Sequence, residues 1–149
     1  MMRRTLKNML FAMGCMLLSS TMACADNSKP LQKRDLPATV QTLLATHFNQ
    51  QRIAYASRET GIGDNDYDVV LQNGTKLEFD KKGNWTEIDC KRGKVPAALI
   101  PQKIRAHVQN TYPGQYITKI ERQRKCYEVE LSSGIELTFS KQFKLVDVD

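Results

Sequence analysis

Hydrophobic and polar residues alternate around a glycine at two places in the chain. In residues 66–79, and again in residues 126–139, Tyr, Val, Leu, Gly, Leu and Phe recur at the same spacing. Alternation with a period of two around a glycine predicts an antiparallel hairpin with one buried face. In the first copy the turn is Asn73-Gly74, a pair typical of tight hairpins. The chain is therefore expected to contain the same hairpin twice.

A helical pattern precedes each hairpin. Apolar residues recur every three or four positions in residues 36–48 and 100–112, and each pattern starts with an apolar residue followed by proline. Asp35 is the expected N-cap of the first helix, with Pro37 in its first turn. Pro113-Gly114 is expected to end the second helix.

Further alternating segments complete four strands in each half. Pro37 corresponds to Pro101 and Tyr67 to Tyr127, so the first copy is the longer one between these points, and its extra residues fall in the loop 61–65. The prediction is an α+β fold of two tandem helix-plus-four-strand antiparallel repeats, residues 36–94 and 95–149, in one structural unit. Helices are expected to pack on one sheet face and to leave the other open. The remaining strands are expected at 53–58, 85–89, 117–122 and 145–148, and the second hairpin strands at 127–131 and 135–139.

Residues 1–25 have the order of a secretory signal peptide. Basic residues come first, an apolar run follows at 9–18, and small residues lead to Ala25. The run is shorter than the roughly 20 residues that span a bilayer. Cleavage after Ala25 and lipidation of Cys24 both fit the end of this signal-peptide pattern. Thr21 is a poor lipobox residue, so simple cleavage is favoured. The protein is expected to leave the cytoplasm, and the polar residues 26–35 to form a flexible lead-in.

Removal of residues 1–25 lowers the net charge. The segment holds three basic residues and no acidic one, so the rest carries 19 Lys and Arg against 16 Asp and Glu, a net of +3. No arginine-rich or base-stacking motif is present, so a nucleic-acid partner is not expected.

Catalytic and metal-binding patterns are weak. His47 and His107 are the only histidines, each on a predicted helix, and His107 occupies a packing position. No motif brings a nucleophile and a base together, so we expect no enzyme and no cofactor. There is no C-x-x-C pair, so a zinc site or thioredoxin-type chemistry is not expected either. By alternation, Cys90 is expected to face the core and Cys126 to face the other side of its strand. A disulfide between them is therefore disfavoured but not excluded.

The open face of the sheet is the candidate binding surface. Alternation directs nine of the sixteen acidic residues to it, together with two aromatic side chains. Such a face suits a cationic partner, either a basic protein segment or a divalent cation. The alternative is a solvated face with no partner, because alternating strands must direct polar residues toward water. The candidate partner-binding residues are Tyr55, Asp68, Glu78, Trp85, Glu87, Glu128, Glu130 and Glu136.

Both hairpins, their apolar-Pro helices and the stretch Asp-Lys-Lys-Gly-Asn-Trp-Thr-Glu-Ile-Asp at 80–89 resemble the PepSY-like secreted proteins over about residues 36–149. The fold of that family is similar to the beta-lactamase inhibitor protein. The resemblance implies two tandem α-β4 units, an envelope or secreted location, and a binding or inhibitory role toward a protein or peptide. A structural envelope lipoprotein anchored through Cys24 is the alternative.

Overall fold

The computed structural model of the protein describes residues 28–59 and 67–149. The predicted signal peptide, Cys24 and the loop insertion at 61–65 lie outside these residues. The strands are β1 (Ser28–Pro30), β2 (Ile53–Glu59), β3 (Tyr67–Leu71), β4 (Lys76–Phe79), β5 (Trp85–Asp89), β6 (Ile117–Arg122), β7 (Cys126–Leu131), β8 (Glu136–Ser140) and β9 (Leu145–Val148). The helices are α1 (Ala38–His47) and α2 (Gln102–Thr111), each preceded by a short 3-10 turn, η1 (Lys33–Asp35) and η2 (Ala97–Leu99).

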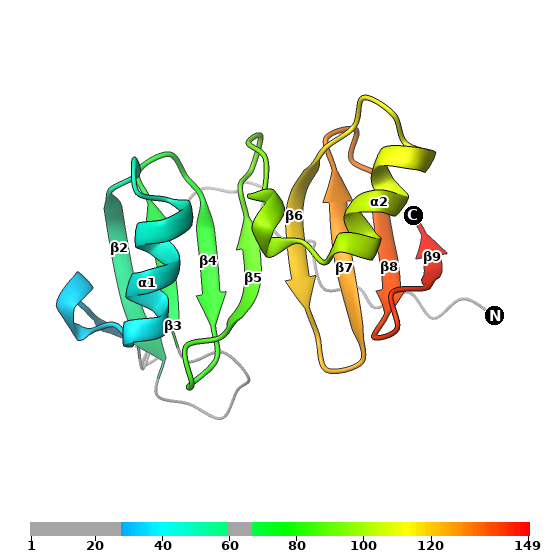
Figure 1. Cartoon of the computed structure of the whole chain (residues 1–149). Coiled ribbons are helices and arrows are strands. Elements are labelled where there is room, and N and C mark those ends of the chain that lie inside the picture. Colours follow the sequence, from blue (N-terminus) through cyan, green and yellow to red (C-terminus); the bar gives the residue numbers. More distant parts are fainter. Residues whose placement is uncertain (1–27, 60–66) are drawn as a thin grey trace, which may run out of the picture.

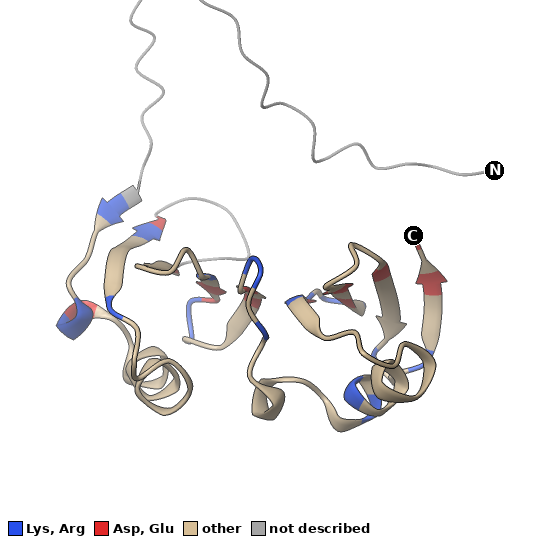
Figure 2. Ribbon diagram, turned by 90° about the horizontal axis from the view of Figure 1, so that it is seen from above, with Lys and Arg blue, Asp and Glu red and all other residues tan. Residues whose placement is uncertain are grey.

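The strands form one nine-stranded sheet in which every strand pairs antiparallel with its neighbour in sequence. Both helices lie on the same side of this sheet, as Figure 1 and the view from above in Figure 2 show. The expected combination of helices with an antiparallel sheet is confirmed, and the expected helices and strands are present with small shifts at their ends. Neither described helix is long and apolar enough to cross a bilayer.

One hydrophobic core lies between the helices and the sheet. Val40 and Leu44 of α1 and Ile104 and Val108 of α2 are buried, because they fall on one side of each helix at a spacing of four. They belong to a single cluster with the inward-facing strand residues. The sheet contributes Ala56, Val69, Leu71, Leu77, Phe79, Ile88, Ile117, Ile120, Val129, Leu131, Leu137 and Phe139.

Two expectations for the start of the domain are wrong. Residues 28–30 of the expected flexible lead-in form β1, which pairs with β2 and continues into a hydrogen bond from Leu31 N–H to the Ala56 carbonyl (2.8 Å). Main-chain pairing at a sheet edge needs no alternation of side chains, so the sequence pattern did not reveal this strand. Asp35 is not the N-cap of α1; it ends η1 and accepts the Gln32 N–H, and Pro37 occupies the N-cap position.

Candidate functional site

The sheet face opposite the helices carries a row of acidic side chains that crosses five strands. Residues directly opposite each other in an antiparallel pair share a face. Asp68 of β3 pairs with Glu78, which pairs with Glu87, and Glu87 pairs across the middle of the sheet with Glu121. Glu121 in turn pairs with Glu128 of β7. We call these five residues the carboxylate row.

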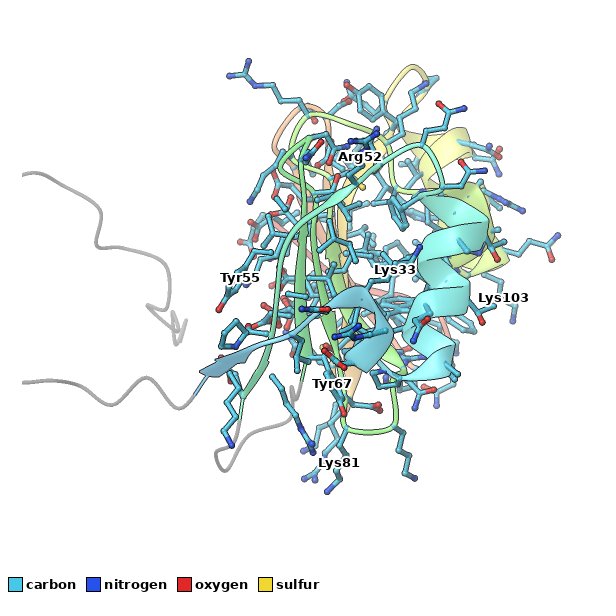
Figure 3. The ribbon with its side chains drawn as sticks, turned by 90° about the vertical axis from the view of Figure 1, so that its left-hand side faces the viewer. Lys33, Arg52, Tyr55, Tyr67, Lys81 and Lys103 are labelled. Carbon is cyan, nitrogen blue, oxygen red and sulfur yellow. The ribbon has the colours of Figure 1, made fainter. Side chains whose placement is uncertain are left out.

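A second row runs beside the first and mixes charges. It passes from Tyr55 through Val70 and Lys76 to Asp89 and Lys119, and then to Glu130 and Glu136. Tyr55 is 46% exposed and projects from the side of the sheet away from the helices, as Figure 3 shows. Figure 2 shows acidic residues along the strands in the same region. Seven of the eight residues predicted for the binding surface therefore share one face.

Two lysines of the second row offset part of the negative charge. Lys76 pairs with Glu78, and the Lys119 ammonium lies 3.3 Å from a Glu87 oxygen. In the part of the chain that the structure describes, Asp68, Glu121 and Glu128 form no ion pair with a lysine or arginine. The row therefore keeps an excess of negative charge that a cationic ligand could neutralise.

Partial burial, together with neighbouring charges and hydrogen bonds, shifts the pKa of several carboxylates on this face. Partial burial, followed by the neighbouring Glu78, raises the pKa of Asp68 above its ordinary value of 3.8. Burial also raises the pKa of Glu87 above 4.5, although Lys119 opposes the shift. By contrast, two hydrogen bonds from Lys91 to Asp89 outweigh burial and lower the pKa of Asp89. Asp68 and Glu87 therefore ionise less readily than exposed carboxylates do.

Replacing Asp68 by asparagine is expected to raise the free energy of unfolding at neutral pH by about 0.5 kcal/mol, a small figure because the side chain is partly exposed. The pKa is higher in the folded than in the unfolded chain, so folding takes up protons between 3.8 and the raised value. The contribution of Asp68 to stability therefore decreases as the pH rises through that window, and the variant should lack this decrease.

Urea unfolding of both proteins from acidic to neutral pH measures the difference. Glu136→Gln, at an exposed position of the same face, is the control. A gain of the same size in that control would contradict the assignment to the burial of Asp68 beside Glu78.

Trp85 does not belong to the outer face, which corrects the sequence-based expectation. The register shifts between Glu78 and Phe79, so Trp85 lies opposite the buried Phe79 and packs against the core cluster. A β-bulge of this kind reverses the facing of the residues beyond it, and alternation alone cannot reveal it. The Arg122 guanidinium lies 4.7 Å from the centre of the Trp85 ring and donates to the Trp85 carbonyl at 2.6 Å.

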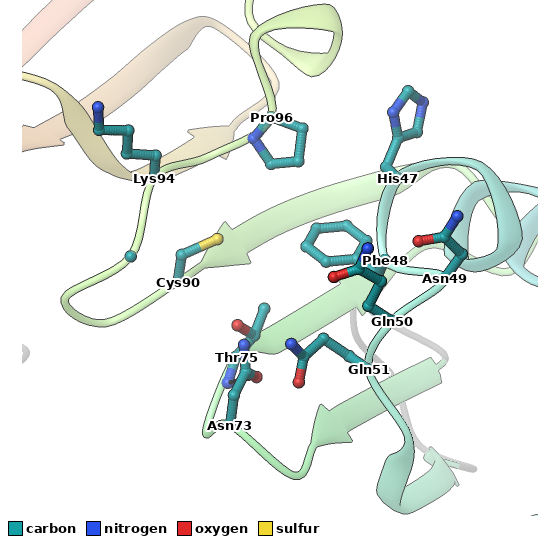
Figure 4. A pocket seen from close by; sticks show the side chains of 11 residues that line it. His47, Phe48, Asn49, Gln50, Gln51, Asn73, Thr75, Cys90, Lys94 and Pro96 are labelled. Carbon is teal, nitrogen blue, oxygen red and sulfur yellow. Dashed lines mark hydrogen bonds between the residues drawn. The ribbon is translucent and has the colours of Figure 1, made fainter.

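The histidines and cysteines form no catalytic arrangement in residues 28–59 and 67–149. His107 packs edge-on against Phe139, with ring centres 5.3 Å apart, which confirms the predicted packing role. His47 and Cys90 line a hollow of about 320 Å³ between the end of α1 and the connector after β5 (Figure 4). Burial raises the pKa of the Cys90 thiol, which makes it a poor nucleophile, and Cys90 and Cys126 are both unpaired.

The described residues also contain no group of three or more His, Cys, Asp or Glu placed to hold a metal ion. The carboxylate row is extended along a line across the sheet, whereas a calcium ion is surrounded by six to eight oxygen ligands.

Comparisons with known proteins identify relatives of this chain. Residues 65–147 match a family model described as "Putative beta-lactamase-inhibitor-like, PepSY-like". A "putative periplasmic protein" of the DUF2874 family from Bacteroides vulgatus is 48% identical, with a TM-score of 0.80, over 84% of this chain and 98% of that one. A "putative calcium-regulated periplasmic protein" from Bacteroides thetaiotaomicron is 44% identical, with the same TM-score and coverage.

A second protein from Bacteroides vulgatus, described as a "putative periplasmic protein of unknown function", is 35% identical over 82% of this chain and 98% of that one, with a TM-score of 0.77. No curated protein matches the chain. The location given for these relatives agrees with the export expected from the signal-peptide pattern, and the protein is assigned to the periplasm or cell envelope.

Proposed function

This chain belongs to the PepSY-like, beta-lactamase-inhibitor-like family, as its paired hairpins predicted, and we propose that it is an exported, non-enzymatic module that binds a basic protein segment on the outer face of its sheet. The observation that carries the proposal is the carboxylate row, in which five acidic residues stand side by side on consecutive strands. Like charges in adjacent cross-strand positions cost stability. The positive charges of a basic segment laid across the strands would offset the repulsion between the carboxylates. The same carboxylates would attract and hold the segment.

Tyr55 supplies the aromatic element of the proposed surface. It is exposed and stands at the β2 end of the second row. Tyrosine offers a large contact area with few rotatable bonds and is enriched at interface centres. Its ring would pack against the aliphatic part of a lysine or arginine side chain of the partner.

The same proposal treats residues 36–94 and 95–149 as two copies of one unit. The pairing of β4 with β5 recurs in the pairing of β8 with β9, including the register shift. Two copies joined edge to edge give a face twice as wide as one unit. In this proposal the helices of both copies cover the opposite face of the sheet. Such width is what an extended segment would need.

Calcium is the second cation to consider, because one relative is described as calcium-regulated. We do not assign a calcium site to this chain, since the described residues lack a group of metal ligands. The alternative of a lipoprotein anchored through Cys24, with a structural role only, is separated by intact mass: a mature chain starting at Asp26 favours the binding module, and a lipidated Cys24 favours the anchor.

The test is neutralisation of the row by Glu121→Gln combined with Glu128→Gln. The probe is a short peptide of alternating lysine and serine, and its affinity is measured by isothermal titration calorimetry at low and high salt. Losing two adjacent charges should weaken binding about tenfold at low salt, with a smaller loss at high salt. The fold should not suffer, because Glu121 and Glu128 face each other and their neutralisation removes a repulsion.

Asp35→Asn is a single-charge control away from the proposed surface, because Asp35 lies on η1 and not on the strands. It removes one negative charge and should leave the affinity nearly unchanged. The proposal is contradicted if the wild-type protein shows no saturable binding at low salt. Equal affinity of the double variant and the wild type would contradict it as well.

A further inference from the structure

The C-terminal strand β9 ends the sheet with its apolar side chains half exposed. Among the residues that the structure describes, β9 is the last strand in the sheet order. Edge strands are usually protected from pairing with another chain by charged residues, by proline, or by a helix or loop that covers them. The large hydrophobic residues exposed in the described chain are Tyr55 and three residues of this one strand: Leu145 (39%), Val146 (66%) and Val148 (48%).

Strand β5 is the internal counterpart of β9. Leu77 pairs with Ile88 in the first half as Leu137 pairs with Val148 in the second, and the register shift before the last pair recurs. By the same correspondence Asp89 matches Asp149. On the side that faces the preceding strand, β5 and β9 are therefore held in the same way.

The two strands differ on their other side. There β5 pairs with β6, which places Ile120 opposite Ile88 and Lys119 opposite Asp89. Ile88 is fully buried, whereas its counterpart Val148 is half exposed. The junction between β5 and β6 therefore indicates what kind of strand would cover β9.

The backbone of β9 is oriented to accept such a strand. Asp149 exchanges two hydrogen bonds of 2.9 Å with Glu136 of β8, so the N–H and carbonyl of Val148 are directed away from β8. Directly after β5 the Cys90 N–H, at the same parity as Ile88, donates to the Thr118 carbonyl of β6. The Val148 N–H instead donates to the side chain of the adjacent Asp147, at 3.0 Å. A carbonyl of an incoming strand would replace this local contact.

We propose that the free edge of β9 binds an extended, antiparallel segment of a partner protein, with an apolar side chain opposite Val148 and a lysine or arginine opposite Asp149. This edge is distinct from the carboxylate row, and the inference does not depend on that row binding anything. A second copy of this chain is a poorer occupant, because antiparallel pairing of two β9 strands centred on Val148 would place Asp147 of each copy opposite Asp149 of the other.

The probe is the peptide of residues 116–122 (Tyr-Ile-Thr-Lys-Ile-Glu-Arg), the sequence that covers β5. Added at millimolar concentration to the isotope-labelled mature protein, it should shift the backbone amide signals of β9, Val148 foremost. Shifts confined to β5, or no saturable shift at all, would overturn the proposal.

Two pairs of variants sharpen the test. Val148→Pro removes the outward N–H without affecting the β8 ladder and should weaken peptide binding about tenfold, whereas Val148→Thr keeps the N–H and should bind nearly as well. Asp149→Lys should weaken binding of the same peptide, and a peptide with Lys119→Glu should restore it. Unchanged affinity of Val148→Pro would overturn the assignment of the edge.

Two further measurements distinguish this surface from the others. Glu121→Gln with Glu128→Gln should leave the affinity for the 116–122 peptide nearly unchanged. The proposed binding at the carboxylate row and the proposed binding at the β9 edge are then tested independently. Sedimentation equilibrium without peptide should give a monomer. A dimer that Val148→Pro dissociates would place a second copy on β9 and overturn the proposed partner.

Discussion

Replacing Ile88 by alanine is expected to lower the free energy of unfolding by about 3 kcal/mol. Ile88 is fully buried in the middle of the sheet, between Leu77 and Ile120. Its truncation removes apolar area from the core and leaves a cavity that two flanking strands and the helices prevent from closing. Urea unfolding followed by circular dichroism measures the loss.

The matched control is Val148→Ala, at the corresponding position of β9. Because Val148 is 48% exposed, its truncation should cost about 0.5 kcal/mol. Ile88 and Val148 are both β-branched and pair with corresponding residues of the preceding strand. The difference between the two losses of stability therefore reports burial and not strand propensity. Losses of equal size would show that β9 is covered in solution and would contradict the exposed edge.

Replacing Gly83 by alanine is expected to destabilise the protein by about 3 kcal/mol. Gly83 has a φ of +80°, which costs an L-residue about 1–2 kcal/mol. An added Cβ would also lie 2.0 Å from Thr39 Oγ1 and 3.1 Å from Pro37 Cβ, at the start of α1. Either the Thr39 side chain or the turn between β4 and β5 therefore has to shift.

Gly134→Ala is the control, because Gly134 has a φ of +87° and no atom within 4 Å of the added Cβ. It should lower the free energy of unfolding only by the cost of a positive φ for an L-residue, about 1 kcal/mol. Adding Thr39→Ala to Gly83→Ala should recover part of the larger loss. Thermal unfolding of the four proteins is the measurement, and equal losses for both glycines would contradict a steric origin.

The counterpart of Gly83 in the second half is Phe143, which also has a positive φ, at 62°. Its ring lies 5.5 Å from that of Tyr127, so a packed aromatic side chain accompanies a strained backbone there. In the first half the same turn position lies beneath a helix and has no room for a side chain. The two halves therefore use one turn geometry under different steric limits.

Alternation predicted most of the candidate surface and failed at one bulge. Asp68, Glu78, Glu87 and Glu128 were placed correctly, because side chains on a regular strand change face at every residue. Trp85 was placed on the wrong face, because the register shift before it depends on how β4 and β5 pair. The continuity of the carboxylate row across Glu87 and Glu121 also depends on the order of the strands in the sheet.

The sequence by itself determined the elements of this protein: two helices from apolar spacing, the paired hairpins from alternation around glycine, and the family from both together. Those signals are local, since each is written in the side chains of one segment. Only the tertiary structure decided that β1 joins the sheet and that Trp85 packs inward under Arg122. It also decided that β9 is the last strand of the sheet among the described residues, whereas β5 is covered by β6. Each of these depends on main-chain pairing between segments, which the side-chain pattern of one strand does not encode.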